Sequence, residues 1–159
     1  MAEKFGKCKA QKNPLAEQLF KDLLNKESFI KFEIARILLN RIQLELEPRF
    51  YKIVNGMFYP YLRVDIVLHP DNYSNVPLEV KNSRRNLKIS QVRKYADFLF
   101  SPLYLLAFST SNAVKIILFK DKNRTEFVIP FVNYEGIKLL DSTSSSVDEL
   151  IEAIKHKNL

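Results

Sequence analysis

The sequence predicts a single α/β domain in which a mixed central β-sheet is flanked by helices. Three observations lead to this class: helical periodicity at the start, β-branched and aromatic runs in the middle, and a helical segment between later strands. A meander followed by a crossover helix and further strands requires both antiparallel and parallel pairing. With 159 residues, 47% of them hydrophobic, the chain is long enough to fill one core.

Two helices are expected before the first strand. Residues 14–25 place leucines on one face, and Pro14 suits a first helical turn. Ser28 suits an N-cap for a second helix that runs to about Leu44, and apolar residues nearly encircle that segment. We therefore expect the second helix to be buried.

The rest of the chain is expected to consist of strands with two further helices. Residues 50–54 and 59–68 are predicted strands joined across Asn55-Gly56, a strong hairpin dipeptide, and residues 69–75 have the composition of a loop. Further strands are predicted at residues 76–81, 103–108, 114–119 and 126–131, with helices at 91–100, capped by Ser90, and at 147–156.

Composition and charge narrow the function classes. The net charge is +7, and the sequence pI near 9.4 favours a polyanionic partner such as DNA. No segment approaches the roughly 20 apolar residues of a membrane span, and no secretion signal is recognisable, so we expect a cytoplasmic protein, in the host cytoplasm if it is viral. One domain is expected over residues 1–159, with residues 1–13 as a flexible basic arm.

Few residues are available for cysteine or histidine chemistry. Cys8 is the single cysteine, and His69 and His156 are the two histidines, so neither an internal disulfide nor a zinc cluster is expected. Any metal must then be held by oxygen ligands.

An acidic cluster is predicted on the second hairpin. If residues 66–68 and 76–78 pair around Asn72, Asp65 lies opposite Glu79, and Lys81 shares their face because side chains alternate along a strand. The opposite face would carry five apolar residues: Val64, Ile66, Leu68, Leu78 and Val80. Two facing carboxylates repel unless a cation lies between them. Carboxylates, a strand carbonyl such as that of Val80, and waters suit Mg²⁺ or Mn²⁺.

These residues resemble the motif of the PD-(D/E)XK nuclease superfamily, in which an acid is followed after a gap by Asp or Glu, any residue, and Lys. Asp65, Glu79 and Lys81 match it, while Val64 replaces the usual proline. The resemblance implies a restriction-endonuclease-like core and metal-dependent hydrolysis of DNA phosphodiester bonds, as an endo- or exonuclease. It implies Asp65 and Glu79 as metal ligands and Lys81 as the catalytic cation.

Two further elements extend the resemblance over residues 28–108. Gln91 and Tyr95 are similar to the Gln-x-x-x-Tyr element of RecB-like nucleases, archaeal resolvase relatives and type I restriction subunits, and would position the phosphate or the catalytic groups. Glu33 corresponds to the acid that many members carry on the helix before the sheet, where it would support the metal. Glu27 and Glu17 stay open as alternatives.

A run without acidic residues follows the motif. The basic residues expected to contact nucleic acid are Arg84, Arg85, Lys88, Arg93 and Lys94. Plainer interpretations remain: a solvated basic loop, surface carboxylates paired with Lys81 or Arg63, a Glu33–Arg36 ion pair, or Tyr95 as a core aromatic. Other functions are a catalytically silent nucleic-acid or protein binding module and a capsid-associated structural protein. A homodimer is expected if both DNA strands are cut.

Overall fold

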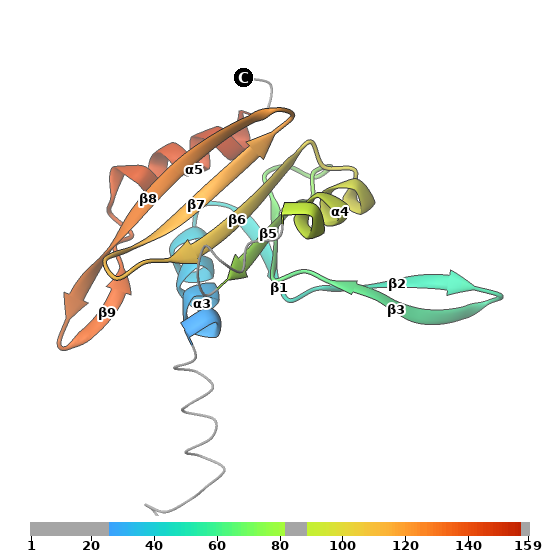
Figure 1. The fold of residues 1–159 in the computed structure, drawn as a ribbon, viewed down its shortest axis with the longest axis horizontal. Coiled ribbons are helices and arrows are strands. Elements are labelled where there is room, and N and C mark those ends of the chain that lie inside the picture. Colours follow the sequence, from blue (N-terminus) through green and yellow to red (C-terminus); the bar gives the residue numbers. More distant parts are fainter. Residues whose placement is uncertain (1–25, 82–88, 157–159) are drawn as a thin grey trace, which may run out of the picture.

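A computed structural model of the chain describes residues 26–81 and 89–156. Within these residues the fold is mixed α/β, with a twisted seven-stranded sheet and three helices (Figure 1). The sheet order is β1 (Gln43–Leu46), β4 (Ile66–His69), β5 (Val76–Lys81), β6 (Leu103–Ser109), β7 (Ala113–Lys120), β8 (Asn123–Tyr134) and β9 (Ile137–Leu140). A separate two-stranded hairpin, β2 (Arg49–Val54) and β3 (Met57–Arg63), extends away from the body.

The helices cover the sheet on both faces. Strands β5 and β6 run parallel, as the crossover through α4 (Ile89–Leu99) requires, while the other pairings described are antiparallel. Helix α4 packs on one face through Val92 and Ala96, which contact Leu106 and its neighbours. Helices α3 (Lys26–Leu38) and α5 (Ser145–Lys155) pack on the other face, where the larger hydrophobic core lies.

The second predicted helix is shorter than expected. Helix α3 already begins at Lys26 within the described residues and ends at Leu38, so Ser28 lies inside it. Gln43 and Leu44 were expected to end the helix but belong to β1, where Leu44 pairs with Leu68 of β4. The physical reason is that Gln43-Leu-Glu-Leu46 alternates with period two, so that as an edge strand it pairs with β4 while Leu44 packs against the larger core.

One predicted strand is two strands. Residues 59–68 were expected to be continuous, but β3 ends at Arg63 and β4 begins at Ile66. The chain changes partners at this point, because β3 pairs with β2 whereas β4 lies between β1 and β5. Asp65 therefore lies at the junction of two sheets rather than within a strand.

Most other elements agree with the sequence. Asn55 and Gly56 have φ values of 52° and 78°, as the predicted hairpin turn requires. Ser144 caps α5 by accepting a hydrogen bond from the Ser146 N–H. Helix α4 begins at Ile89, so Ser90 is not its cap, and β9 was not expected.

Some expectations concern residues that the structure does not describe. The predicted helix at 14–25 and the basic arm at 1–13 both lie outside the described ranges. Over residues 26–81 and 89–156, no helix has the length and apolar character needed to cross a membrane.

Candidate active site

The predicted register of the second hairpin is confirmed. Ile66 pairs with Leu78 and Leu68 with Val76, which sets Asp65 beside Glu79. The Asp65 N–H donates a hydrogen bond of 2.9 Å to Glu79 Oε1, and the Val80 N–H donates one of 2.9 Å to Asp65 Oδ2. Each carboxylate is thus held by the backbone beside the other, and the two acids are fixed as a pair.

Glu79 is the more buried acid of this pair. Its residue is 5% exposed, and it lies on the face covered by α4, beside Leu106 of β6. The pKa of Glu79 is raised to about 7, first by burial and then by the negative charge of Asp65, while the Asp65 N–H and Lys81 act in the opposite direction. The surrounding groups therefore leave the ionised form of Glu79 undercompensated at neutral pH.

Two lysines approach the acid pair from different elements. Lys81 Nζ lies 4.0 Å from Glu79 Oε2 and, as expected, on the same side of β5. Lys31 Nζ of α3 lies 3.3 Å from Asp65 Oδ1 and 2.8 Å from Glu47 Oε2. The pair therefore has one ammonium group near each acid.

The positions of Lys31 and Glu47 beside the acid pair were not predicted from the sequence. Burial lowers the pKa of Lys31, but its hydrogen bonds and charge interactions with Glu47 and Asp65 outweigh that effect and leave it raised. The hydrogen bond from Lys31 lowers the pKa of Glu47. The available signal was a lysine between Ile30 and Phe32 in a helix predicted to be buried, since a buried lysine almost always has a partner.

Gln91 and Tyr95 are joined to each other on α4 and lie near the acids. Gln91 Nε2 donates a 2.8 Å hydrogen bond to Tyr95 Oη. Tyr95 is buried against Val64 and Val67, so it is also a core aromatic. Val64 was expected to face the larger core with Ile66, but it faces this smaller cluster instead. Burial raises the pKa of Tyr95; the bond from Gln91 opposes this, and the charges of Glu79 and Asp65 add to it. The phenol thus lies in the field of the acid pair.

Glu33 does not join the acid pair. Its carboxylate accepts two hydrogen bonds of 2.9 Å from Arg36 and one of 2.8 Å from the Leu140 N–H, so both oxygens are engaged near β9. Residues two apart on a helix point about 200° apart, and Lys31 is the one that faces Asp65. The expectation that Glu33 supports the metal is therefore not met, and the alternative of an ion pair with Arg36 is the one observed.

The other two candidate helix acids fare differently. Glu27 precedes Lys31 by one helical turn and so lies on the same side of α3. Glu17 lies outside the described residues. In the described part of the chain, no three His, Cys, Asp or Glu side chains are grouped closely enough to hold a metal ion.

The predicted nucleic-acid contacts are only partly described. Arg84, Arg85 and Lys88 fall in residues 82–88, outside the described ranges. Arg93 and Lys94 are exposed on α4. A hydrogen bond with Tyr104 raises the pKa of Arg93. The Arg93 side chain is therefore directed towards Tyr104.

A hard divalent cation fits the acid pair as a site with few protein ligands. Asp65 Oδ1 and Glu79 Oε2 contact Lys31 and Lys81 at 3.3 and 4.0 Å, and Val80, the residue after Glu79, donates its backbone N–H to Asp65 Oδ2. Magnesium is commonly held by one or two carboxylates and several waters. The raised pKa of Glu79 is the mark of a carboxylate that an added cation would stabilise in its ionised form.

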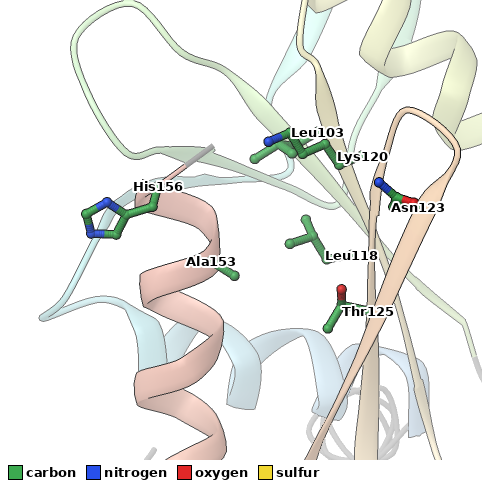
Figure 2. A pocket seen from close by; sticks show the side chains of 7 residues that line it. All are labelled: Leu103, Leu118, Lys120, Asn123, Thr125, Ala153 and His156. Carbon is green, nitrogen blue, oxygen red and sulfur yellow. The ribbon is translucent and has the colours of Figure 1, made fainter. Parts of the chain in front are cut away.

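A cavity of about 400 Å³ lies elsewhere, between α5 and the sheet (Figure 2). Figure 2 shows Leu118 and Thr125 of the strands opposite Ala153 of α5, with His156 at the helix end. Leu103 and Leu118 belong to the core under α3 and α5, so this cavity opens on the face of the sheet away from Glu79. It is not part of the acidic site.

Comparisons with known proteins assign no family. No protein-family model and no curated protein sequence matches the chain. The crystal structure of SSO0001 resembles it with a TM-score of 0.39 and 17% sequence identity, over 86% of this chain and 66% of that one. At that level of similarity, the comparison supports neither a fold family nor an activity.

Proposed function

We propose that this protein is a nuclease that hydrolyses DNA phosphodiester bonds with a divalent cation, Mg²⁺ or Mn²⁺, on a restriction-endonuclease-like core. The observation that carries the proposal is the acid pair Asp65–Glu79, held by two backbone hydrogen bonds, with Lys81 beside it and the Gln91–Tyr95 pair close by. These are the residues whose pattern resembles the PD-(D/E)XK motif and its Gln-x-x-x-Tyr extension. Glu33 has no place in the proposed site.

Each residue has a distinct role in the proposed reaction. Asp65 and Glu79 hold the cation, which supplies Lewis acidity and neutralises charge at the phosphate. Lys81 stabilises the negative charge that develops on the phosphate oxygens. Tyr95, oriented by the bond from Gln91, donates a hydrogen bond to a phosphate oxygen or positions the catalytic groups. Burial of Glu79 excludes water from one side of the site.

One observation favours a second function, a nucleic-acid binding module that does not cut. Lys31 Nζ already lies 3.3 Å from Asp65 Oδ1 and is anchored by Glu47. An ammonium in this position neutralises part of the acid pair without any metal, as a purely structural network would. The two functions differ in whether divalent ions matter.

The test is cleavage by the full chain in buffer with manganese or with EDTA, on plasmid and single-stranded DNA. Asp65→Asn, Glu79→Gln and Lys81→Met are each expected to lose activity on the order of 10²- to 10³-fold, because each removes a ligand or a charge that acts on the transition state. Matched exposed controls are Glu149→Gln and Lys155→Met of α5, which should cut as well as the wild type.

Two outcomes would overturn the proposal. Equal cleavage by all variants would show that another site or a contaminant cuts. DNA binding by the wild type without any metal-dependent cleavage would favour the binding module instead.

A further inference from the structure

The β2–β3 hairpin exposes apolar side chains to an unusual degree. It projects from the body as a separate two-stranded sheet (Figure 1). Its exposed apolar residues are Tyr51, Ile53, Val54, Met57, Phe58, Tyr59 and Tyr61. A two-stranded hairpin is marginally stable in water, and an apolar surface of this kind is typical of a binding site. We therefore expect the hairpin to bind a partner.

The charge of the hairpin indicates the chemistry of that partner. The segment from Arg49 to Arg63 contains three basic residues, Arg49, Lys52 and Arg63, and no aspartate or glutamate. Basic side chains interleaved with aromatic rings are the composition of surfaces that bind single-stranded nucleic acid, where bases stack on rings and phosphates meet cations. A polyanion with exposed flat rings is complementary to this segment.

One face of the hairpin combines these two features. Lys52 pairs with Tyr59, so their side chains share a face, and Tyr61 lies at the register shift between the Tyr51–Pro60 and Phe50–Leu62 pairs. Lys52 Nζ lies 5.7 Å from the centre of the Tyr61 ring, and Lys94 Nζ of α4 lies 5.6 Å from it. We call Lys52, Tyr59, Tyr61 and Lys94 the basic-aromatic face.

Aromatic rings pack together at the base of this face. The ring of Phe98 on α4 contacts Tyr61 at 5.0 Å and Phe50 at 5.7 Å between centroids. A cavity of about 340 Å³ lies at this base, lined by Arg49, Phe50, Tyr61, Leu62 and Arg63. The packing of the Tyr61 ring beside this cavity favours stacking of a base, because less side-chain freedom is lost on binding.

The basic-aromatic face is connected to the acid pair. Helix α4 carries Lys94 and Phe98 towards the hairpin and Tyr95 towards Glu79. At the other end, Arg63 lies 3.8 Å from Glu47, which bonds Lys31. The acid pair and the hairpin are therefore linked through α4 and through the Arg63–Glu47–Lys31 contacts.

We infer that the basic-aromatic face binds single-stranded nucleic acid, with bases stacked on Tyr59 and Tyr61 and phosphates at Lys52 and Lys94. The inference rests on the proposed function, since it extends the substrate of the acid pair onto the hairpin. A second copy of the chain is a poorer occupant. Two such faces packed by two-fold symmetry would bring their lysines together, and like charges disfavour that contact.

The test is fluorescence anisotropy of a labelled 20-nucleotide oligothymidylate, in EDTA so that no cleavage occurs. Tyr59→Thr removes an exposed ring and keeps a residue suited to a strand; Kd should rise at least about fivefold, since stacking of one base is worth that much. Lys52→Gln should weaken binding and reduce the salt slope by about 0.7. The matched control is Tyr134→Thr, an exposed tyrosine of β8, which should bind as the wild type does.

Two further variants separate competing explanations. Phe58→Thr changes the neighbouring ring on the opposite face of β3 and should have a smaller effect than Tyr59→Thr. Glu149→Gln, at an exposed residue of α5, should retain full affinity for the oligonucleotide. If cleavage never occurs but Tyr59-dependent binding persists, the proposed nuclease fails and this inference stands.

Unchanged affinity of Tyr59→Thr and Lys52→Gln would overturn the inference, even for an active nuclease. A wild-type dimer in size-exclusion chromatography that Tyr59→Thr converts to monomer, at unchanged oligonucleotide affinity, would assign the face to self-association instead.

Discussion

Glu33 and Glu79 are two buried glutamates with opposite surroundings. They are 6% and 5% exposed, respectively. Glu33 accepts paired hydrogen bonds from Arg36 and a third from the Leu140 N–H. Glu79 accepts a backbone hydrogen bond from Asp65, faces the carboxylate of that residue, and lies 4.0 Å from the Lys81 ammonium nitrogen.

The difference distinguishes a structural acid from a candidate catalytic one. Glu33 ties α3 to the end of β9, because Arg36 also donates to the Leu140 carbonyl at 2.8 Å. Glu79 is held in a geometry that raises its pKa, and groups with perturbed pKa values cluster at functional sites. The two glutamates are therefore equally buried but unequally compensated by neighbouring charges. Three measurements test this difference.

The largest effect is expected in the pH dependence of stability in EDTA. The pKa of Glu79 is about 7 in the folded protein, against an ordinary value of 4.5, so the folded state holds its proton more tightly. Between pH 4.5 and 7 the unfolded state releases the proton first, and the free energy of unfolding falls as pH rises, by up to about 3 kcal/mol. Below pH 4.5 the penalty vanishes.

Glu79→Gln removes this titration and should be more stable than the wild type at pH 8, with the gain lost at pH 4.5. Chemical denaturation at both pH values measures it. A wild-type curve parallel to that of Glu79→Gln would contradict the assigned pKa. Glu149→Gln, an exposed control, should follow the wild type.

Glu33→Gln should have the opposite sign at pH 8. Gln cannot neutralise Arg36, although it retains an acceptor for Leu140, so we expect a loss of about 1–3 kcal/mol of unfolding free energy. Urea denaturation with Glu126→Gln, whose partner Lys115 lies at 3.8 Å on an exposed edge, provides the comparison. If both substitutions cost the same, Glu33 is not the structural anchor inferred here.

The smallest effect is expected from metal binding. At manganese tenfold above Kd, ligand binding adds about 1.4 kcal/mol of stability, which corresponds to a rise of a few degrees in Tm. The wild type and Glu33→Gln should show this rise, and Glu79→Gln should not. A rise that persists in Glu79→Gln would place the metal elsewhere, and no rise in any variant would favour the silent binding module.

Local patterns predicted the middle of the fold well. The Asn55-Gly56 turn, the register around Asn72 and the strands β5, β6 and β7 follow from dipeptide geometry and runs of β-branched residues. The proximity of Asp65 and Glu79 was predictable because a short hairpin relates its residues by counting alone. Gln91 and Tyr95 share a helical face for the same local reason.

The errors concern residues whose partners are distant in sequence. Leu44 pairs with Leu68, and residues 43–46 leave the helical pattern for that reason. Lys31 donates hydrogen bonds to Glu47 and Asp65, which lie outside its helix. Glu33 accepts a hydrogen bond from Leu140, more than a hundred residues away. None of these contacts is set by spacing along the chain.

The proximity of Asp65, Glu79 and Lys81 and the basic character of the hairpin follow from the sequence alone, because they depend on strand alternation, turn chemistry and composition. The identity of the α3 residue that faces the acid pair depends on tertiary packing. Lys31 and Glu33 lie on different sides of α3, and the packing of that helix against the sheet turns the ammonium towards Asp65 and the carboxylate towards β9. The orientation of a packed helix is set by its whole buried surface, which no single residue pattern specifies.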